Sequence, residues 1–376
     1  MRKIKVLEVI DRTFLGGGQK NLLSLAENLD RNKFDISVCS NPEGPLVDEA
    51  KRKNIPHFPV SMSKCLRREP IKDIEALLTK HGFDIIHTHG GVAGFYGRWA
   101  ARKHKDLAVV HTLHGVHYLY YRNVVLKYAY ICLERFFSRF THAVIFVSRA
   151  DREKGEKLRL ASRKKIKLIE NGIDFSLFER TGMKESAVGE VREQPVIGTV
   201  ARLHRQKNIP LLLRAGARIR KHCPGVKIFV VGGGQRRQKL ERLSMRLGTD
   251  DMVCFLGERE DVLELMSGFD IFVLPSLWEG LPYVLMEAAA LEKPVIGTDV
   301  DGIKEIIENE KTGILVSPDN PDELSGAALK LLNDKALAEK FGSDLHRSLR
   351  ERYSISLMID KIQNLYGELS RRKGKH

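Results

Sequence analysis

Residues 4–40 read IKVLEVIDRTFLGGGQKNLLSLAENLDRNKFDISVCS, and this stretch decides the fold of the first half of the chain. Its short runs at 4–10 and 34–40 are mostly apolar, which is typical of strands buried in a parallel sheet. Between them, Gly16–Gly18 precede a segment whose leucines recur at helical spacing. Strand, glycine turn, helix and strand in that order predict a βαβ unit.

The same alternation of short apolar runs and longer helical patterns continues along the whole chain. Further strands are expected at 83–89, 107–113, 142–148, 195–201, 226–232, 252–257, 271–276 and 294–299, and helices at 208–222 and 236–247. We therefore predict an α/β protein with two doubly wound, Rossmann-like domains that face one another across a cleft.

A polar, aperiodic stretch at 181–194 divides the chain and is interpreted as a linker. The first domain is expected to cover residues 1–180 and the second 195–352, sizes that suit two separate cores. Residues 353–376 are expected to form a C-terminal helix that packs back on the first domain.

The composition limits the classes of partner and compartment. Lys and Arg outnumber Asp and Glu by 63 to 48, a formal net charge of +15, which favours nucleotides, phosphorylated substrates, acidic membranes or nucleic acid without choosing among them. The five cysteines form no CxxC pair, so neither a disulfide framework nor a zinc site is indicated. The interrupted apolar run at the N-terminus and the lack of an 18-residue apolar window predict a cytoplasmic protein without a membrane span.

Ligands of open α/β sheets bind beyond the carboxyl ends of the strands, and several candidate residues lie directly after predicted strands. Gly16–Gly18 can let backbone N–H groups approach an anion, although a permissive tight turn is the simpler interpretation. In the second half, Arg202 and Lys207 stand beside a helix start that we expect Asn208 to cap. That arrangement can clamp a diphosphate, and the alternative is a solvated basic loop.

The strongest candidate is the segment that contains Glu279 and Glu287. Gly280 and Pro282 hold a loop that opens into a helix, so free N–H groups of this loop can bind phosphate. A glutamate in the first helical turns can accept hydrogen bonds from ribose hydroxyls.

Histidines cluster at the ends of two predicted strands. His87 and His89 lie at the end of one strand, and His111, His114 and His117 surround the next. A metal site would need an accompanying cluster of carboxylates or thiols, and none is adjacent. A metal site is therefore not expected, and most of these side chains are interpreted as packing or loop residues. His114, which precedes Gly115, is the one selected as functional.

The pair Asp299 and Asp301 is interpreted as a turn and not as a metal-binding motif, because it follows a strand and precedes a glycine.

Together these segments make the chain resemble the retaining GT-B glycosyltransferases of family 4, close to those that build bacterial envelope polysaccharides. The resemblance covers essentially the whole length and is most specific at Glu279–Glu287, which matches the family's EX7E signature. Gly233 stands where the family usually has Asp, and Asp301 replaces the first of two glycines, which loosens inference about the substrate but not about the class.

The resemblance implies the following roles. Arg202 and Lys207 would bind the donor diphosphate, Glu287 the ribose, and Glu279 the transferred sugar, while His114 would lie at the reacting centre. The residues implied as donor-binding are Gly17, Gly18, Arg202, Lys207, Gly257, Gly280, Leu281, Pro282, Tyr283, Val284 and Glu287, and those implied as catalytic are His114, Arg202, Lys207 and Glu279. No cofactor or bound metal ion would be required, since cationic side chains and helix-end amides would stabilise the leaving diphosphate.

The expected partners are a nucleotide-sugar donor, with UDP favoured over GDP, and a glycan or lipid-linked acceptor of envelope polysaccharide synthesis. Tyr, Phe, Lys and Arg between His117 and Phe140 suit a helix on an anionic membrane surface, and Arg67 and Arg68 with Cys65 add to the basic first domain. The same helix can instead pack its aromatics inward. Two alternatives remain at this point: a GT-B sugar-nucleotide epimerase or hydrolase, and a basic nucleic-acid-binding protein, for which no binding module is present.

Overall fold

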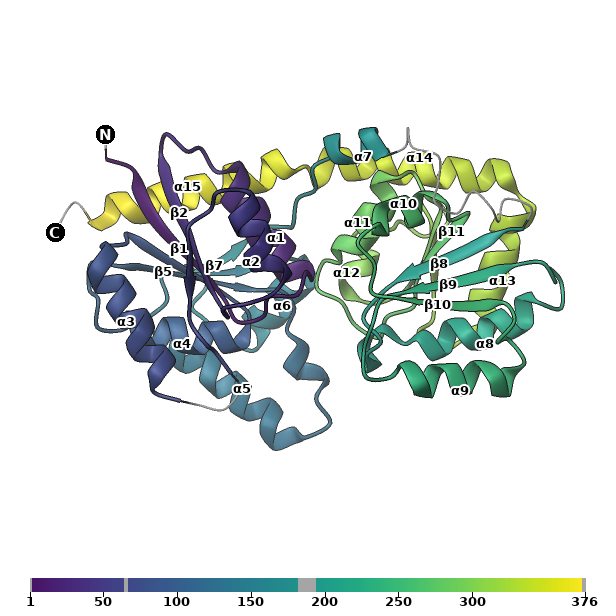
Figure 1. The fold of residues 1–376 in the computed structure, drawn as a ribbon, viewed down its shortest axis with the longest axis horizontal. Helices are drawn as coiled ribbons and strands as arrows, with labels where there is room; N and C mark the ends of the chain where they lie inside the picture. The colour runs from purple at the N-terminus through teal and green to yellow at the C-terminus, as the bar shows by residue number, and fades with distance from the viewer. Residues whose placement is uncertain (1, 64–66, 182–193, 374–376) are drawn as a thin grey trace. The chain divides into compact units, whose positions relative to one another are not determined.

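The computed structural model describes residues 2–63, 67–181 and 194–373 (Figure 1). The chain forms two compact units: unit 1 comprises Met1–Gly172 with Ile355–His376, and unit 2 comprises Ile173–Ser354. Unit 2 thus begins before the expected end of the first domain at residue 180, because α7 (Ser176–Thr181) contacts α10 (Val262–Ser267). The expected linker at 181–194 lies, except for its two end residues, outside the described residues.

Unit 1 is built on a seven-stranded parallel sheet in the order β3-β2-β1-β4-β5-β6-β7. Its strands are β1 (Ile4–Ile10), β2 (Phe34–Ser40), β3 (His57–Pro59), β4 (Ile85–His89), β5 (Ala108–Leu113), β6 (Ala143–Phe146) and β7 (Ile166–Leu168). All residues of β4 and β5 are buried, because helices cover both faces of the sheet, and this includes the histidines and threonines of the two strands.

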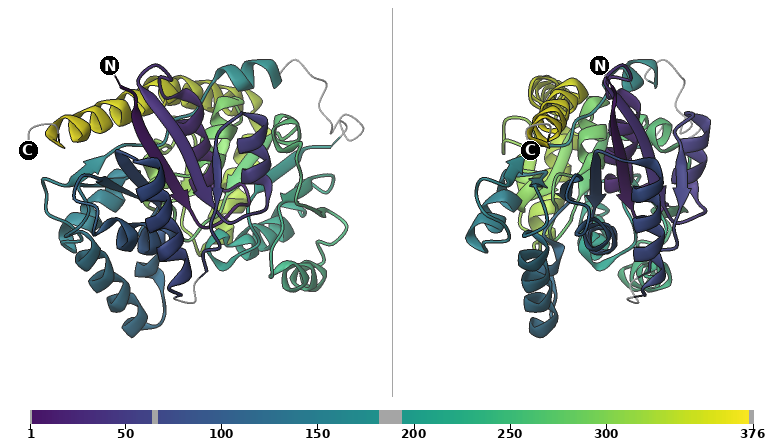
Figure 2. Two further views of the ribbon diagram at one scale, coloured as in Figure 1. Left: turned by 60° about the vertical axis from the view of Figure 1, so that its left-hand side comes forward. Right: turned by 90° about the vertical axis from the view of Figure 1, so that its left-hand side faces the viewer.

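The helices of unit 1 connect successive strands, apart from the last one. They are α1 (Gly17–Asn28), α2 (Pro45–Arg52), α3 (Glu69–His81), α4 (Gly91–Ala101), the 3-10 turn η1 (His117–Tyr120), α5 (Val124–Phe137), α6 (Arg149–Lys157) and α15 (Ile355–Lys373). Figure 2 shows α15 running beside the first strands of the sheet. Its residues Met358, Ile362 and Tyr366 join the core formed by α1, β1 and β2, so the end of the chain completes unit 1.

Unit 2 repeats the plan with a six-stranded parallel sheet in the order β10-β9-β8-β11-β12-β13. Its strands are β8 (Val196–Val200), β9 (Lys227–Val231), β10 (Val253–Gly257), β11 (Ile271–Leu274), β12 (Val295–Thr298) and β13 (Ile314–Val316). Besides α7 and α10, its helical segments are η3 (Arg205–Lys207), α8 (Ile209–Ile219), α9 (Arg237–Leu247), α11 (Tyr283–Ala290), α12 (Asp301–Lys304), α13 (Pro321–Asn333) and α14 (Lys335–Arg352). The two Rossmann-like units predicted from the sequence are therefore confirmed.

The strand orders locate the ligand-binding edges of both units. In each sheet the order reverses at one point, between β1 and β4 in unit 1 and between β8 and β11 in unit 2. Loops that leave the carboxyl ends of two such strands diverge to opposite faces of the sheet and leave a crevice between them. We therefore expect the functional side chains to lie in the loops after β1, β4, β8 and β11.

Candidate functional site

In unit 2 the loops after β8 and β11 meet through a cluster around Glu279. The Lys207 ammonium lies 2.6 Å from Oε1 of Glu279, and the Ser276 hydroxyl donates a hydrogen bond of 2.6 Å to the same oxygen. The Gln206 amide donates to Oε2 of Glu279 at 3.3 Å and to the carbonyl of Trp278 at 2.9 Å. The side chains of Lys207 and Glu279 are only 13% and 7% exposed, so the carboxylate is buried with its charge compensated.

Two of the predicted functional residues, Lys207 and Glu279, are thus in direct contact although 72 residues separate them. Arg202 lies in the same loop after β8, and its side chain is exposed. The loop is held by the hydrogen bond from the N–H of Leu203 to the carbonyl of Gly233 at 2.7 Å, which ties it to the turn after β9.

Asn208 does not cap the following helix as the sequence suggested. Its backbone adopts a left-handed conformation with φ of +48°, and its side-chain amide donates to the carbonyl of Pro318 at 2.8 Å. Asn tolerates this conformation better than most residues, so Asn208 ends the 3-10 turn that carries Lys207.

The segment Gly280–Val284 is buried except for Val284, and it leads into α11, which begins at Tyr283. Glu287 lies in the second turn of this helix and is 6% exposed. The segment is fixed by Gly302, since a Cβ atom at that position would lie 1.4 Å from the carbonyl oxygen of Gly280. The second glycine of the family pattern is therefore a packing requirement in this chain.

Gly257 ends β10 with φ of +73°, a conformation that favours glycine, and its carbonyl accepts a hydrogen bond from the N–H of Gly232. Asp299 and Asp301, which the sequence analysis assigned to a turn, precede and begin α12, and Asp299 lies 3.6 Å from the Lys304 ammonium.

In unit 1 the glycine loop after β1 and the histidine loop after β5 come together. Gly17 is exposed and opens α1, whereas Gly18 lies against the ring of His114, where a Cβ atom would be 3.3 Å from Cδ2. The side chain of Gln19 closes the loop, since its oxygen accepts from the N–H of Gly16 at 3.2 Å and its amide donates to the carbonyl of Arg12 at 2.9 Å.

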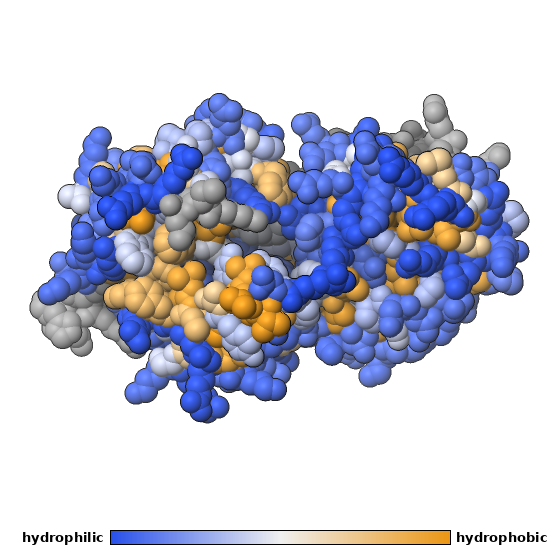
Figure 3. Space-filling model, turned by 90° about the horizontal axis from the view of Figure 1, so that it is seen from below, coloured by the Kyte–Doolittle hydropathy of each residue, from blue (hydrophilic) through white to orange (hydrophobic). Residues whose placement is uncertain are grey.

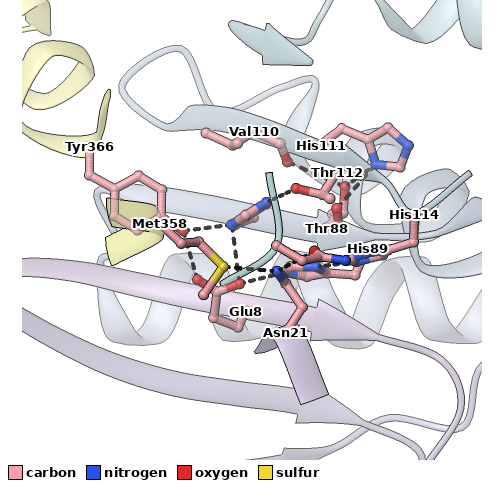
Figure 4. Close-up of polar contacts among 12 residues, drawn as sticks. Glu8, Asn21, Thr88, His89, Val110, His111, Thr112, His114, Met358 and Tyr366 are labelled. Atoms are coloured by element: carbon pink, nitrogen blue, oxygen red, sulfur yellow. Dashed lines mark hydrogen bonds and ion pairs between the residues drawn. The ribbon is translucent and has the colours of Figure 1, made fainter. Parts of the chain in front are cut away.

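His114, which is half-buried, belongs to a hydrogen-bond network that begins at the buried Glu8 (Figure 4). Nε2 of His89 lies 2.7 Å from Oε2 of Glu8, and Nδ1 of His89 lies 3.0 Å from Nε2 of His114. The Tyr366 hydroxyl of α15 donates to Oε1 of Glu8 at 2.7 Å, and His87 contacts both Tyr366 and Glu8. The expectation that no carboxylate accompanies these histidines is therefore wrong, because pairing of β1 with β4 places Glu8 opposite His87.

Burial sets the protonation of this network. Burial raises the pKa of Glu8, but charge and hydrogen bonding from His87 and His89 outweigh it and hold the pKa well below its ordinary value. Burial lowers the pKa of His89 to about 4 and that of His114 well below the ordinary value. The network therefore combines an ionised Glu8 with neutral His89 and His114 at neutral pH.

A carboxylate oxygen of Glu8 and ring nitrogens of His87 and His89 lie within 4.8 Å of one another, and these atom types are zinc ligands. All of them already take part in hydrogen bonds with one another or with Tyr366 and Thr112. We therefore describe the cluster as a hydrogen-bond network.

The sequence analysis did not select some members of the Glu279 cluster and of the Glu8 network as functional. Gln206 directly precedes Lys207 and Ser276 lies three residues before Glu279, but neither carries a motif of its own. Glu8 offered a clear signal, since a charged residue inside an apolar strand requires a buried partner. Tyr366 offered none, because it lies 358 residues further along the chain.

The chain matches two family models. Residues 15–177 match the model described as Glycosyltransferase Family 4, and residues 184–345 match the model described as Glycosyl transferases group 1.

Curated relatives agree with these matches. UDP-Gal:alpha-D-GlcNAc-diphosphoundecaprenol alpha-1,3-galactosyltransferase of Escherichia coli is 30% identical over 97% of both chains. A capsular polysaccharide biosynthesis glycosyltransferase of Staphylococcus aureus is 26% identical over 59% of this chain and 60% of that protein.

Solved structures share the fold. Anabaena HepE, crystallised with UDP and glucose, superposes with a TM-score of 0.86 at 21% identity, covering 97% of this chain and all of that one. Sucrose-phosphate synthase of Thermosynechococcus elongatus gives 0.82 at 21% identity, with 98% and 99% of the two chains covered.

Proposed function

Because this chain belongs to glycosyltransferase family 4, we propose that it transfers a hexosyl unit from a UDP-sugar to a glycan or lipid-linked acceptor of envelope polysaccharide synthesis. The chain is a glycosyltransferase of the GT-B fold. We further propose that the reaction retains the anomeric configuration of the sugar and needs no bound metal ion. The Escherichia coli relative is named for UDP-galactose and a diphosphoundecaprenol acceptor, which supports a UDP donor and a lipid-linked acceptor.

The Lys207–Glu279 contact at the strand-order reversal of unit 2 carries this proposal. An ammonium group has three N–H donors, so Lys207 can keep its bond to Glu279 while it binds a donor phosphate. Glu279, held by Ser276 and Gln206, keeps a fixed position from which to contact the transferred sugar.

We assign the remaining donor contacts as follows. Arg202 and Lys207 stabilise the negative charge that grows on the leaving diphosphate, and Glu287 accepts hydrogen bonds from the ribose. The backbone of Gly280, Leu281, Pro282, Tyr283 and Val284 contacts the diphosphate or sugar, and Gly257 borders the base. His114 acts on the sugar undergoing transfer.

Thermal unfolding in the presence of UDP, GDP, UDP-galactose, UDP-glucose and GDP-mannose tests the donor class. A ligand at 100 times its Kd stabilises the native state by about 2.7 kcal/mol, which raises the Tm of a domain of this size by roughly 5–10 °C. We expect the shift with UDP compounds and not with GDP compounds. The anomeric configuration of the product, read by NMR, tests retention, and an inverted product or the lack of any nucleotide shift would reject the proposal.

A peripheral position on an anionic membrane surface is the second part of the proposal. Among the described helices, none is both long and apolar enough to cross a membrane. α5 instead buries only Ile131, Glu134 and Phe137, and its outer side is apolar. The exposed large apolar residues on and beside this helix are Tyr121, Val124, Val125, Leu126, Tyr128 and Phe136, with Val125 79% exposed.

Figure 3 shows apolar side chains gathered on the face of unit 1 seen from below. The exposed Arg122 precedes α5 and the exposed Arg139 follows it, so cationic groups flank the apolar surface. Aliphatic and aromatic side chains bordered by basic residues suit insertion among the headgroups of anionic lipids, near a lipid-linked acceptor.

Flotation with vesicles of phosphatidylglycerol and phosphatidylcholine tests this surface. Val125→Glu should weaken binding about 10-fold or more, because it removes an inserted apolar group and adds a repelled charge. Met245→Glu on α9 of unit 2 is the matched control, since Met245 is also exposed but lies outside the patch. Binding should fall as salt rises, and equal binding of Val125→Glu and the control would contradict the assignment.

A further inference from the structure

The network from Tyr366 to His114 has one consistent arrangement of protons. An ionised carboxylate can only accept hydrogen bonds, so at Glu8 both the Tyr366 hydroxyl and Nε2 of His89 are donors, each at 2.7 Å. A neutral histidine that carries its proton on Nε2 has a lone pair on Nδ1. Nδ1 of His89 therefore accepts the hydrogen bond of 3.0 Å from Nε2 of His114.

The last group in this chain of bonds is Nδ1 of His114. Since the proton of neutral His114 sits on Nε2, its Nδ1 carries a lone pair and can only accept. Within the described parts of the chain, the hydrogen bond to His89 is the one His114 makes, so Nδ1 remains available to a ligand.

The surroundings keep the ring neutral and in place. The groups that act on its charge are His87 and His89 of β4, Glu8 of β1 and His117 of η1. Burial and the three histidines lower the pKa of His114, and together they outweigh Glu8, which raises it. Tyr366 reaches the network from α15. Gly18 leaves room for the ring, because a side chain at this position would contact the edge of the His114 ring that carries Nε2.

We propose that Glu8 and His89 are positioning residues that hold His114 in one tautomer, so that its Nδ1 accepts a hydrogen bond from a hydroxyl group of a carbohydrate substrate. The inference rests on the proposed function for the identity of the substrate, but the tautomer itself does not. A neutral nitrogen acceptor binds a group that carries a proton, such as a sugar hydroxyl, and offers nothing to a phosphate oxygen. The hydroxyl belongs either to the donor sugar or to the acceptor, which share this chemistry.

The tautomer is tested without any substrate by 15N NMR of histidine-labelled protein at neutral pH. The signals of His114 and His89 are assigned by their loss in His114→Asn and His89→Gln. We expect both histidines to be protonated on Nε2 and bare on Nδ1. A proton on Nδ1 of His114, or on both of its nitrogens, would overturn the proposal.

Rescue by a conservative variant separates positioning from mere packing. His89→Gln retains one N–H donor for Glu8 and one oxygen acceptor for His114 at a spacing close to that of the two ring nitrogens. His89→Leu retains bulk but neither group. We expect kcat/KM to fall about 10-fold or more in His89→Leu and to return to within about 3-fold in His89→Gln. His111→Asn is the matched control, because His111 is equally buried but bonds to Thr88 and stands outside the network.

Binding and kinetics then identify the source of the hydroxyl. If it belongs to the donor sugar, His89→Leu and His114→Ala weaken UDP-galactose binding about 10-fold and leave the affinity for UDP unchanged. If it belongs to the acceptor, both nucleotide affinities stay constant and the KM for GlcNAc-diphosphoundecaprenol rises. Wild-type kinetics in folded His114→Ala and His89→Leu would overturn the proposal. Failure of the wild-type protein to bind any UDP compound would count against the proposed function, while the NMR result still decides the tautomer.

Discussion

Lys207→Ala should destabilise unit 2 even without substrate. In the native protein the ammonium lies 2.6 Å from Oε1 of Glu279, and both side chains are more than four-fifths buried. Removing one partner of a buried ion pair costs about 3–5 kcal/mol, because the other charge stays behind in a poorly solvating environment. Ser276 and Gln206 still donate to the carboxylate, so we place the loss at about 2–3 kcal/mol.

The source of this loss is testable by a double-mutant cycle. Glu279→Gln keeps the volume and an acceptor oxygen but carries no charge, so it should cancel part of the penalty of Lys207→Ala. We expect a coupling energy of about 1–2 kcal/mol between the two sites. A coupling below about 0.5 kcal/mol, within the scatter of independent sites, would show that the ion pair does not contribute and would refute this reasoning.

Urea unfolding followed by tryptophan fluorescence measures these quantities. The chain has two tryptophans, and Trp99→Phe leaves Trp278, which lies next to Glu279, as the reporter of unit 2. Lys311→Ala is the matched control, since its contact of 3.5 Å with Glu308 is exposed on both sides and should be worth less than about 1 kcal/mol. If the urea midpoint shifts while the slope of the unfolding free energy against urea concentration stays the same, stability alone has changed.

Three other outcomes are expected. Glu287→Gln should weaken UDP binding about 10- to 150-fold, the loss of roughly 1.5–3 kcal/mol of a charge-assisted hydrogen bond, and unchanged calorimetric affinity in a folded variant would reject the ribose contact. Transfer should survive excess EDTA, whereas activity that disappears and returns with manganese or magnesium would contradict the metal-independent mechanism. Unit 1 should lose stability as pH falls from 6.5 towards about 4, because the lowered pKa of His89 makes the unfolded state bind more protons in that window. The limiting slope is about 1.4 kcal/mol per pH unit for each such histidine, and a urea midpoint from Trp99 that stays constant over this range would disprove it.

The sequence predicted the central strands well because burial on both faces of a sheet favours short, mostly apolar runs of residues. β1 and β2 have the expected bounds, and the other predicted strands differ at their ends. The edge strands β3, β7 and β13 were missed, since three residues are too few to show any pattern. The positions of Lys207 and Glu279 follow from topology and not from local patterns. In a doubly wound sheet both residues come after strands at the reversal of strand order, so they lie at the same edge of the sheet.

The contacts at that edge could not be predicted in the same way. The sequence indicated that Lys207 and Glu279 are functional, but not that they pair with each other in the free protein. Such pairing depends on side-chain rotamers and on Ser276 and Gln206, whose residue types occur in every polar loop. The histidine network shows the same limit more strongly, since its protonation follows from burial and from contacts of Glu8 with His87 and His89 on a neighbouring strand. Its hydrogen bonding also involves Tyr366 at the far end of the chain.

The two units compensate the charge of a buried glutamate with different groups. Each buries a glutamate at the point where its strand order reverses, Glu8 in unit 1 and Glu279 in unit 2. Glu279 is compensated by the cation of Lys207, which leaves ammonium N–H groups for an anionic ligand. Glu8 is compensated by donors from Tyr366 and neutral His89, which leaves at His114 a lone pair and no charge. A diphosphate therefore suits the edge of unit 2, and a sugar hydroxyl suits the edge of unit 1. Exchanging the compensating group should weaken binding of the matching ligand: Lys207→Gln should weaken diphosphate binding by unit 2, and His89→Lys should weaken binding of the sugar hydroxyl by unit 1.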